Sequence, residues 1–162
     1  MNIIDSPLHE LPWFDTAAAD IAGGRSKLSL TGAADSGKLH IISALSGQTD
    51  VTLILTYSDI VASQVADEYR FFDRNTCYYP AKDLIFYQAD INGRETLKER
   101  LKVLRTLLTC KKMTIVTTFN ALMETCLPLE VIKDHIFEIE KGTTLEEEAA
   151  AVLLTSMGYE RT

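Results

Sequence analysis

The sequence is poor in cysteine and histidine and has no long apolar run. Three cysteines (Cys77, Cys110 and Cys126) form no C-x-x-C pair, and only three histidines accompany them, so neither a disulfide framework nor a zinc site is predicted. The longest apolar runs, such as Val51 to Leu55, are far shorter than the roughly 20 residues that span a bilayer. Acidic residues interrupt the first 25 positions, which excludes a cleavable signal peptide as well as a membrane span. We therefore expect a cytoplasmic protein with free thiols.

Basic residues are also fewer than acidic residues over the whole chain. Sixteen basic residues against 23 acidic ones give a net charge of −7, which excludes a whole-protein field that attracts nucleic acid. Residues 94–112 are locally basic and residues 130–148 locally acidic, so the composition changes near Pro128. We interpret Pro128 as the start of a second domain. The hydrophobic content of 46% and charged content of 24% are typical of globular proteins.

Hydrophobic periodicity predicts alternating strands and helices. Short β-branched or apolar runs at 28–31, 51–56, 76–79 and 113–117 are typical of buried strands. Two apolar stripes at helical spacing lie between them and are expected to face the core. This alternation predicts an α/β fold, a parallel sheet flanked by helices. The stripes consist of Val61, Val65, Tyr69 and Phe72, and of Leu97, Leu101, Leu104 and Leu108.

The pattern differs after Pro128. Residues 135–140 alternate as a strand does, Gly142 suits a turn, and Thr144 with Glu147 forms a capping box that opens a helix. Gly158 is expected to end that helix, and the sequence stops where a further strand would begin. Residues 128–162 are therefore predicted to be the beginning of an α+β domain.

One motif points to nucleotide chemistry. Residues 32–39 read Gly-Ala-Ala-Asp-Ser-Gly-Lys-Leu, between a predicted strand and a predicted helix, as in a phosphate-binding loop. In such a loop Gly32, Gly37 and Lys38 would hold the phosphates. Leu39, however, stands where a Ser or Thr must bind Mg²⁺, and Asp35 adds a charge that repels phosphate. The loop is therefore predicted to be degenerate, with no catalytic residue, metal site or cofactor.

The remaining acidic, histidine and aromatic side chains form no recognisable catalytic or metal-binding motif. Asp59 follows the 51–56 strand but is placed to cap the next helix rather than to hold a metal. The histidines form no triad with Ser or Cys. Trp13 and Phe14 are expected to anchor the leading helix to the sheet.

Several segments together resemble the amino-terminal region of one bacterial protein family, the transcription-repair coupling factor Mfd. These segments are Tyr79 to Tyr87, Glu99 to Leu101, Val116 to Met123, and Gly158 to Arg161. The matches run in order along essentially the whole chain. Val116 to Met123 is similar to the family's strand, Thr-x-x-Ala-Leu-Met turn and helix.

The resemblance implies a fold and a partner. It implies a helicase-like, UvrB-mimicking domain over residues 1–127 and the start of a UvrA-interacting inserted domain over 128–162. Arg161 matches an arginine that contacts UvrA in the family, and Tyr159 beside it is a second candidate contact, with packing as its alternative role. DNA and RNA polymerase contacts are expected from other domains of the family. The fragment is thus expected to be a non-catalytic module that helps recruit UvrA.

Two other functions remain open from the residues. The chain could be the nucleotide-binding half of an active P-loop NTPase or helicase, which predicts Mg²⁺-dependent nucleotide binding through Lys38. It could instead bind DNA through Lys98, Lys102 and Arg105, although a solvated helix face is the better explanation of these side chains.

Overall fold

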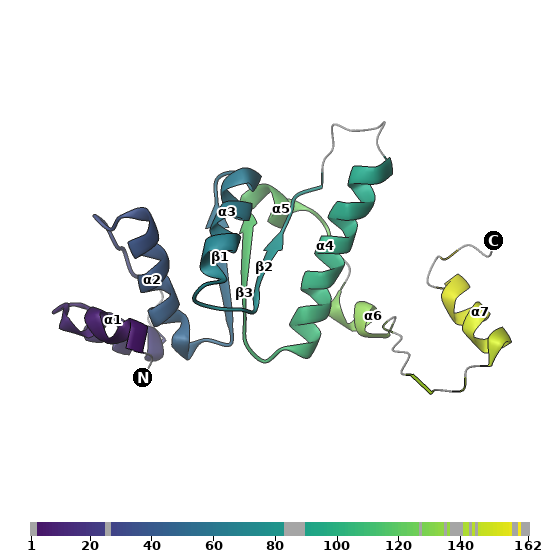
Figure 1. Cartoon of the computed structure of the whole chain (residues 1–162), viewed down its shortest axis with the longest axis horizontal. Helices are drawn as coiled ribbons and strands as arrows, with labels where there is room; N and C mark the ends of the chain where they lie inside the picture. Colours follow the sequence, from purple (N-terminus) through teal and green to yellow (C-terminus); the bar gives the residue numbers. More distant parts are fainter. Residues whose placement is uncertain are drawn as a thin grey trace. The chain divides into compact units, whose positions relative to one another are not determined.

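The computed structural model describes residues 3–24, 27–82, 90–126, 128–134, 136, 141, 142, 144, 146–156 and 159 (Figure 1). The chain divides into two compact units, Met1–Thr125 and Cys126–Thr162. The assignment of residues 1–127 to a helicase-like domain and of 128–162 to an inserted domain stays a prediction.

A parallel sheet of three strands organises the first unit. β1 (Val51–Thr56), β2 (Thr76–Tyr79) and β3 (Met113–Thr118) lie in the order β1-β3-β2, with Val51 beside Met113 and Thr76 beside Thr114. The helices α3 (Asp59–Tyr69) and α4 (Asp90–Thr109) connect these strands and flank the sheet (Figure 1). The predicted α/β class, a parallel sheet flanked by helices, is confirmed.

The core lies on both faces of β3, which is buried along its whole length. On one face, Ala62 and Ala66 of α3 pack against Val116, and all three are fully buried. On the other face, Val103 of α4 packs with Met113 and Ile115. A strand that is buried on both sides is uniformly apolar or β-branched, which explains the sequence of β3.

Helix α4 buries a different face from the one predicted. Leu97 and Leu101 are 53% and 47% exposed, whereas Arg100 and Val103 are 4% and 2% exposed. The buried face is therefore rotated by one residue from the leucine stripe, and the prediction for Leu97 and Leu101 is wrong. The reason is that the charge of Arg100 is paired inside the fold, so this side chain can occupy an inward position.

The segment before the sheet forms its own small core. It comprises η1 (Ile3–Glu10), α1 (Phe14–Ala22), α2 (Asp35–Leu45) and η2 (Ser46–Gln48). Phe14 packs with Leu8, Ile41 and Leu45, so it anchors α1 to α2 and not to the sheet as expected. The predicted strand at 28–31 is wrong as well, because these residues pair with no strand of the described sheet.

A strand-to-helix turn closes the first unit. α5 (Phe119–Met123) follows β3 directly, and the Thr118 hydroxyl caps it by accepting a bond from the Ala121 amide at 3.3 Å. This confirms the strand, turn and helix expected from residues 116–123.

The second unit contains α6 (Leu129–Asp134) and α7 (Glu147–Ser156). Gly142 has a φ of +102°, a conformation that favours glycine, and forms the expected turn. The helix begins at Glu147, three residues after the predicted Thr144 start. The predicted strand at 135–140, apart from Ile136, and the predicted helix end at Gly158 lie outside the described residues. None of the helices in the described ranges is long and apolar enough to cross a membrane.

Candidate phosphate loop and the carboxyl edge of the sheet

The candidate phosphate loop leads into α2. Gly32 has a φ of +82°, which only glycine adopts without strain, and it turns the chain toward the helix. α2 begins at Asp35, so Gly37 and Lys38 already lie in its first turns. The Lys38 amide donates to the Ala34 carbonyl at 2.8 Å. This amide is therefore used within the helix, whereas the amides of a working loop point at phosphate.

The metal position of the motif is occupied by a core residue. Leu39 is 7% exposed, while Lys38 before it is exposed. A buried leucine offers neither an oxygen atom nor an accessible position for Mg²⁺. In addition, no strand of the described sheet leads into Gly32, which a phosphate loop of this class requires.

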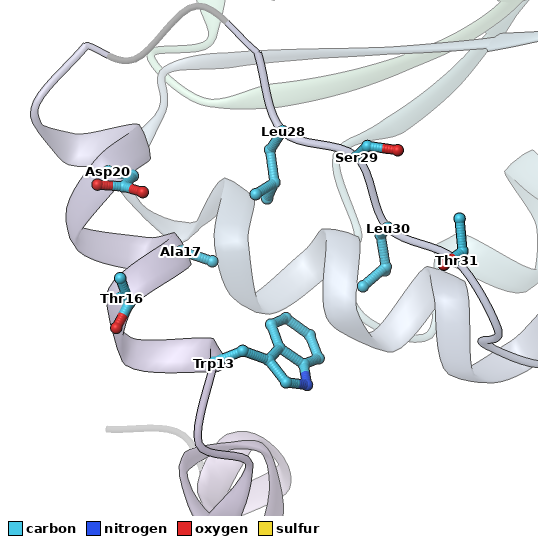
Figure 2. A pocket seen from close by; sticks show the side chains of 8 residues that line it. All are labelled: Trp13, Thr16, Ala17, Asp20, Leu28, Ser29, Leu30 and Thr31. Carbon is cyan, nitrogen blue, oxygen red and sulfur yellow. The ribbon is translucent and has the colours of Figure 1, made fainter.

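A pocket lies between α1 and the segment that precedes the loop. Figure 2 shows Trp13, Leu28 and Leu30 directed into this pocket, beside α2. Its other lining residues include Asp20 but no basic side chain, and none of Gly32, Gly37 and Lys38 lines it. Its chemistry suits an apolar group and not a phosphate.

Asp59 ties together the carboxyl ends of β2 and β3. Its Oδ1 accepts bonds from the Tyr78 hydroxyl at 3.0 Å, the Ala81 amide at 3.3 Å and the Thr118 hydroxyl at 3.4 Å. Burial raises the pKa of Tyr78, and the hydrogen bond to Asp59 and its negative charge raise this pKa further. Tyr78 therefore remains a neutral donor to the carboxylate.

Asp59 thus has a role different from the one predicted. The cap of α3 is Ser58, whose hydroxyl accepts from the Val61 amide at 3.3 Å. Among the described residues, no group of three or more His, Cys, Asp or Glu side chains is placed to hold a metal ion. With three donors on one oxygen, Asp59 acts as a structural tether at the edge where α/β proteins bind their ligands.

An ion pair between a buried arginine and a partly buried glutamate braces the same region. The Arg100 guanidinium donates to Glu124 Oε2 at 2.8 Å and to the Pro80 carbonyl at 2.9 Å, and it lies 4.2 Å from the centre of the Tyr79 ring. Glu124 Oε1 accepts from the Lys82 amide at 2.6 Å. The pair therefore joins the chain after β2 to the chain after α5. The sequence analysis missed this pair, because the apolar spacing of the helix falls on Leu97, Leu101, Leu104 and Leu108 and gives no sign that Arg100 faces inward.

The carboxyl edge of the sheet also carries exposed apolar side chains. Tyr57 follows β1 and is 89% exposed, and Phe119 follows β3 and is 65% exposed. Since Thr56 and Thr118 are neighbours in the sheet, these two residues leave it side by side. Ile60 and Met123, in the adjoining helices, are exposed to a similar extent. Exposed apolar groups of this size are typical of interaction surfaces.

The predicted partner-binding residues fall at the end of the chain. Tyr159 is 65% exposed, and its amide donates to the Leu154 carbonyl at 3.1 Å. Arg161 lies outside the described residues. The role of both residues in binding therefore stays a prediction.

The basic residues of α4 lie at the surface. Lys98, Lys102 and Arg105 are exposed, and Lys98 lies 3.9 Å from Glu95 in a solvated ion pair. Such pairs contribute little to stability. Their positions agree with a solvated helix face.

Comparison with known proteins gives a consistent set of relatives. The chain is 26% identical over 164 residues to the transcription-repair-coupling factor of Bacillus subtilis, covering 99% of this chain and 14% of the relative. It is 22% identical over 141 residues to the corresponding factor of Staphylococcus epidermidis, covering 85% of this chain and 12% of that protein.

UvrABC system protein B of Neisseria meningitidis serogroup B is 26% identical over 158 residues, covering 87% of this chain and 23% of the relative. No protein-family model matches. The chain thus spans less than a quarter of the length of each of these proteins. Over 85–99% of its own length the chain is similar to transcription-repair-coupling factors, and over 87% of it to UvrABC system protein B.

Proposed function

We propose that this chain is a non-catalytic, UvrB-like interaction module of transcription-coupled nucleotide excision repair that helps recruit UvrA. Similarity to both transcription-repair-coupling factors and UvrABC system protein B supports a role in nucleotide excision repair. The exposed apolar side chains at the carboxyl edge of the sheet support a binding role.

The burial of Leu39 carries the non-catalytic part of the proposal. Nucleotide hydrolysis needs a bound Mg²⁺ to neutralise charge on the phosphates, and the loop residue that holds it must offer oxygen. In this chain the corresponding residue is Leu39, which is buried in the core. The degenerate loop then serves as a turn into α2.

An active nucleotide-binding site is the alternative, because Gly32, Gly37 and Lys38 keep the spacing of the motif. Calorimetric titration with Mg-ATP and Mg-ADP separates the two functions. We expect no binding heat from the native chain or from Lys38→Ala, since the metal ligand is absent and the Lys38 amide is bonded to Ala34. Micromolar binding by the native chain that disappears in Lys38→Ala would contradict the proposal.

Recruitment is tested by biolayer interferometry of the whole chain against purified UvrA. We expect saturable binding, and we expect Arg161→Ala to weaken it by about 30-fold, the effect of an interface hot spot of about 2 kcal/mol. Arg74→Ala, which removes an exposed arginine from the first unit, serves as the matched control and should leave the affinity unchanged. The absence of UvrA binding would refute the recruitment role, whereas equal binding by Arg161→Ala would remove only that residue.

A further inference from the structure

Helix η1 meets α2 through an apolar contact and a polar contact. Leu8 of η1 packs with Ile41 and Leu45 of α2 in the small core of this segment. Beside it, His40 Nε2 of α2 lies 3.6 Å from Asp5 Oδ1 of η1. The His40 and Asp5 side chains are 23% and 24% exposed. A histidine and a carboxylate therefore face each other, largely out of water, where η1 and α2 meet.

The Nε2 atom of His40 is buried and has no hydrogen-bond partner within the described part of the chain. A buried polar atom without a partner is uncommon and calls for an explanation. In a neutral ring that carries its proton on Nδ1, Nε2 is an acceptor and cannot bond to a carboxylate. A neutral ring with the proton on Nε2 could donate, but only the protonated ring also brings a positive charge to Asp5.

An aromatic ring covers His40 as well. Phe72, which follows α3, stacks on the His40 ring with 5.6 Å between the ring centres and 9° between the ring planes. The face of an aromatic ring attracts a cation at this distance. Both Asp5 and Phe72 thus favour the charged form of His40.

The other titratable groups that the structure describes near this contact do not explain a pH effect at His40. Tyr69, beside Phe72, remains neutral because burial raises its pKa. Both carboxylate oxygens of Asp73 accept hydrogen bonds at the amino end of the sheet. On η1 itself, His9 lies 2.6 Å from Asp15 of α1, but this pair is exposed and contributes little.

We propose that the contact between Asp5 and His40 is a pH-sensitive clasp that fastens η1 to α2 when His40 is protonated. Imidazole takes up its proton near pH 6.5, about the middle of the range between pH 5 and pH 8. The protonated ring finds Asp5 and Phe72 beside it only in the folded segment, so protonation stabilises the folded form. The stability that the clasp contributes is therefore present in mild acid and is lost as the pH rises through neutrality.

Urea unfolding of the whole chain, followed by tryptophan fluorescence, tests this inference. Trp13 is the sole tryptophan, and its ring centre lies 5.9 Å from that of Phe14 in the same small core, so its emission reports on this segment. We expect the equilibrium constant for unfolding to be about fivefold smaller at about pH 5.5 than at about pH 7.5.

Two substitutions separate the clasp from any general effect of pH. Asp5→Asn keeps the size of the side chain but removes its charge, and His40→Gln removes the titrating ring. Each should reduce the pH effect to less than about twofold. His135→Gln, which removes a histidine from the second unit, is the matched control and should keep the full effect. A native chain whose unfolding constant does not change with pH, or a full pH effect in Asp5→Asn, would overturn the proposal.

Discussion

Replacing Arg100 with alanine is expected to lower the free energy of unfolding by about 3–5 kcal/mol, because it leaves a partly buried carboxylate without its cation. Arg100 is 4% exposed and donates to Glu124 and to the Pro80 carbonyl. The substitution also removes the contact of the guanidinium with the Tyr79 ring. Urea unfolding followed by circular dichroism measures the loss.

A matched variant and a double-mutant cycle identify the cause. Lys102→Ala removes an exposed charge from the same helix and should change stability by no more than about 0.5 kcal/mol. Arg100→Ala combined with Glu124→Gln should cost less than the sum of the two single changes, since the second removes the unpaired charge left by the first. Additive losses would show that the ion pair does not brace the fold.

Replacing Phe14 with alanine is expected to cost about 3–5 kcal/mol, the usual loss for a buried aromatic side chain. Phe14 is 2% exposed and packs between α1 and α2 with Leu8, Ile41 and Leu45. Its ring also forms T-shaped pairs with the His9 and Trp13 rings, whose centres lie 5.1 and 5.9 Å away. Urea unfolding measures the total loss in the free energy of unfolding. Hydrogen exchange should show that the backbone amides of α1 and α2 lose more protection than those of β3.

Trp13→Ala is the control for this experiment. Trp13 is adjacent in sequence but 37% exposed at the pocket, so its removal should cost no more than about half as much. Equal losses at the two positions would contradict the assignment of Phe14 as the anchor. A loss of protection in β3 as large as that in α1 would contradict the separate packing of this cluster.

Local patterns in the sequence were sufficient for much of the fold. The strands at 51–56, 76–79 and 113–118, the long helix before β3 and the turn from β3 into α5 all follow from runs and spacings a few residues long. The prediction that the motif at 32–39 departs from a working phosphate loop likewise came from the sequence, because the loop residue that binds Mg²⁺ must carry a side-chain oxygen at a fixed place and Leu39 has none. Burial of Leu39, by contrast, depends on what packs around α2.

Tertiary contacts decided the remainder. The 28–31 segment has a strand-like pattern, but a strand exists only when a partner strand supplies its backbone bonds, and none in the described sheet does so. From the sequence alone, Asp59 was expected to cap a helix. In the structure its carboxylate accepts bonds from Tyr78, Ala81 and Thr118, which are 19, 22 and 59 residues away in the chain.

The face of α4 gives the clearest example of both contributions. The sequence by itself determined that residues 97–108 form an amphipathic helix, since its periodicity is local. Only the tertiary structure decided which side is buried, because Arg100 can turn inward when Glu124, 24 residues later in the chain, neutralises it. A prediction based on residue type alone places every arginine at the surface. The free energy of burying a charge, however, depends on the partner that neutralises it.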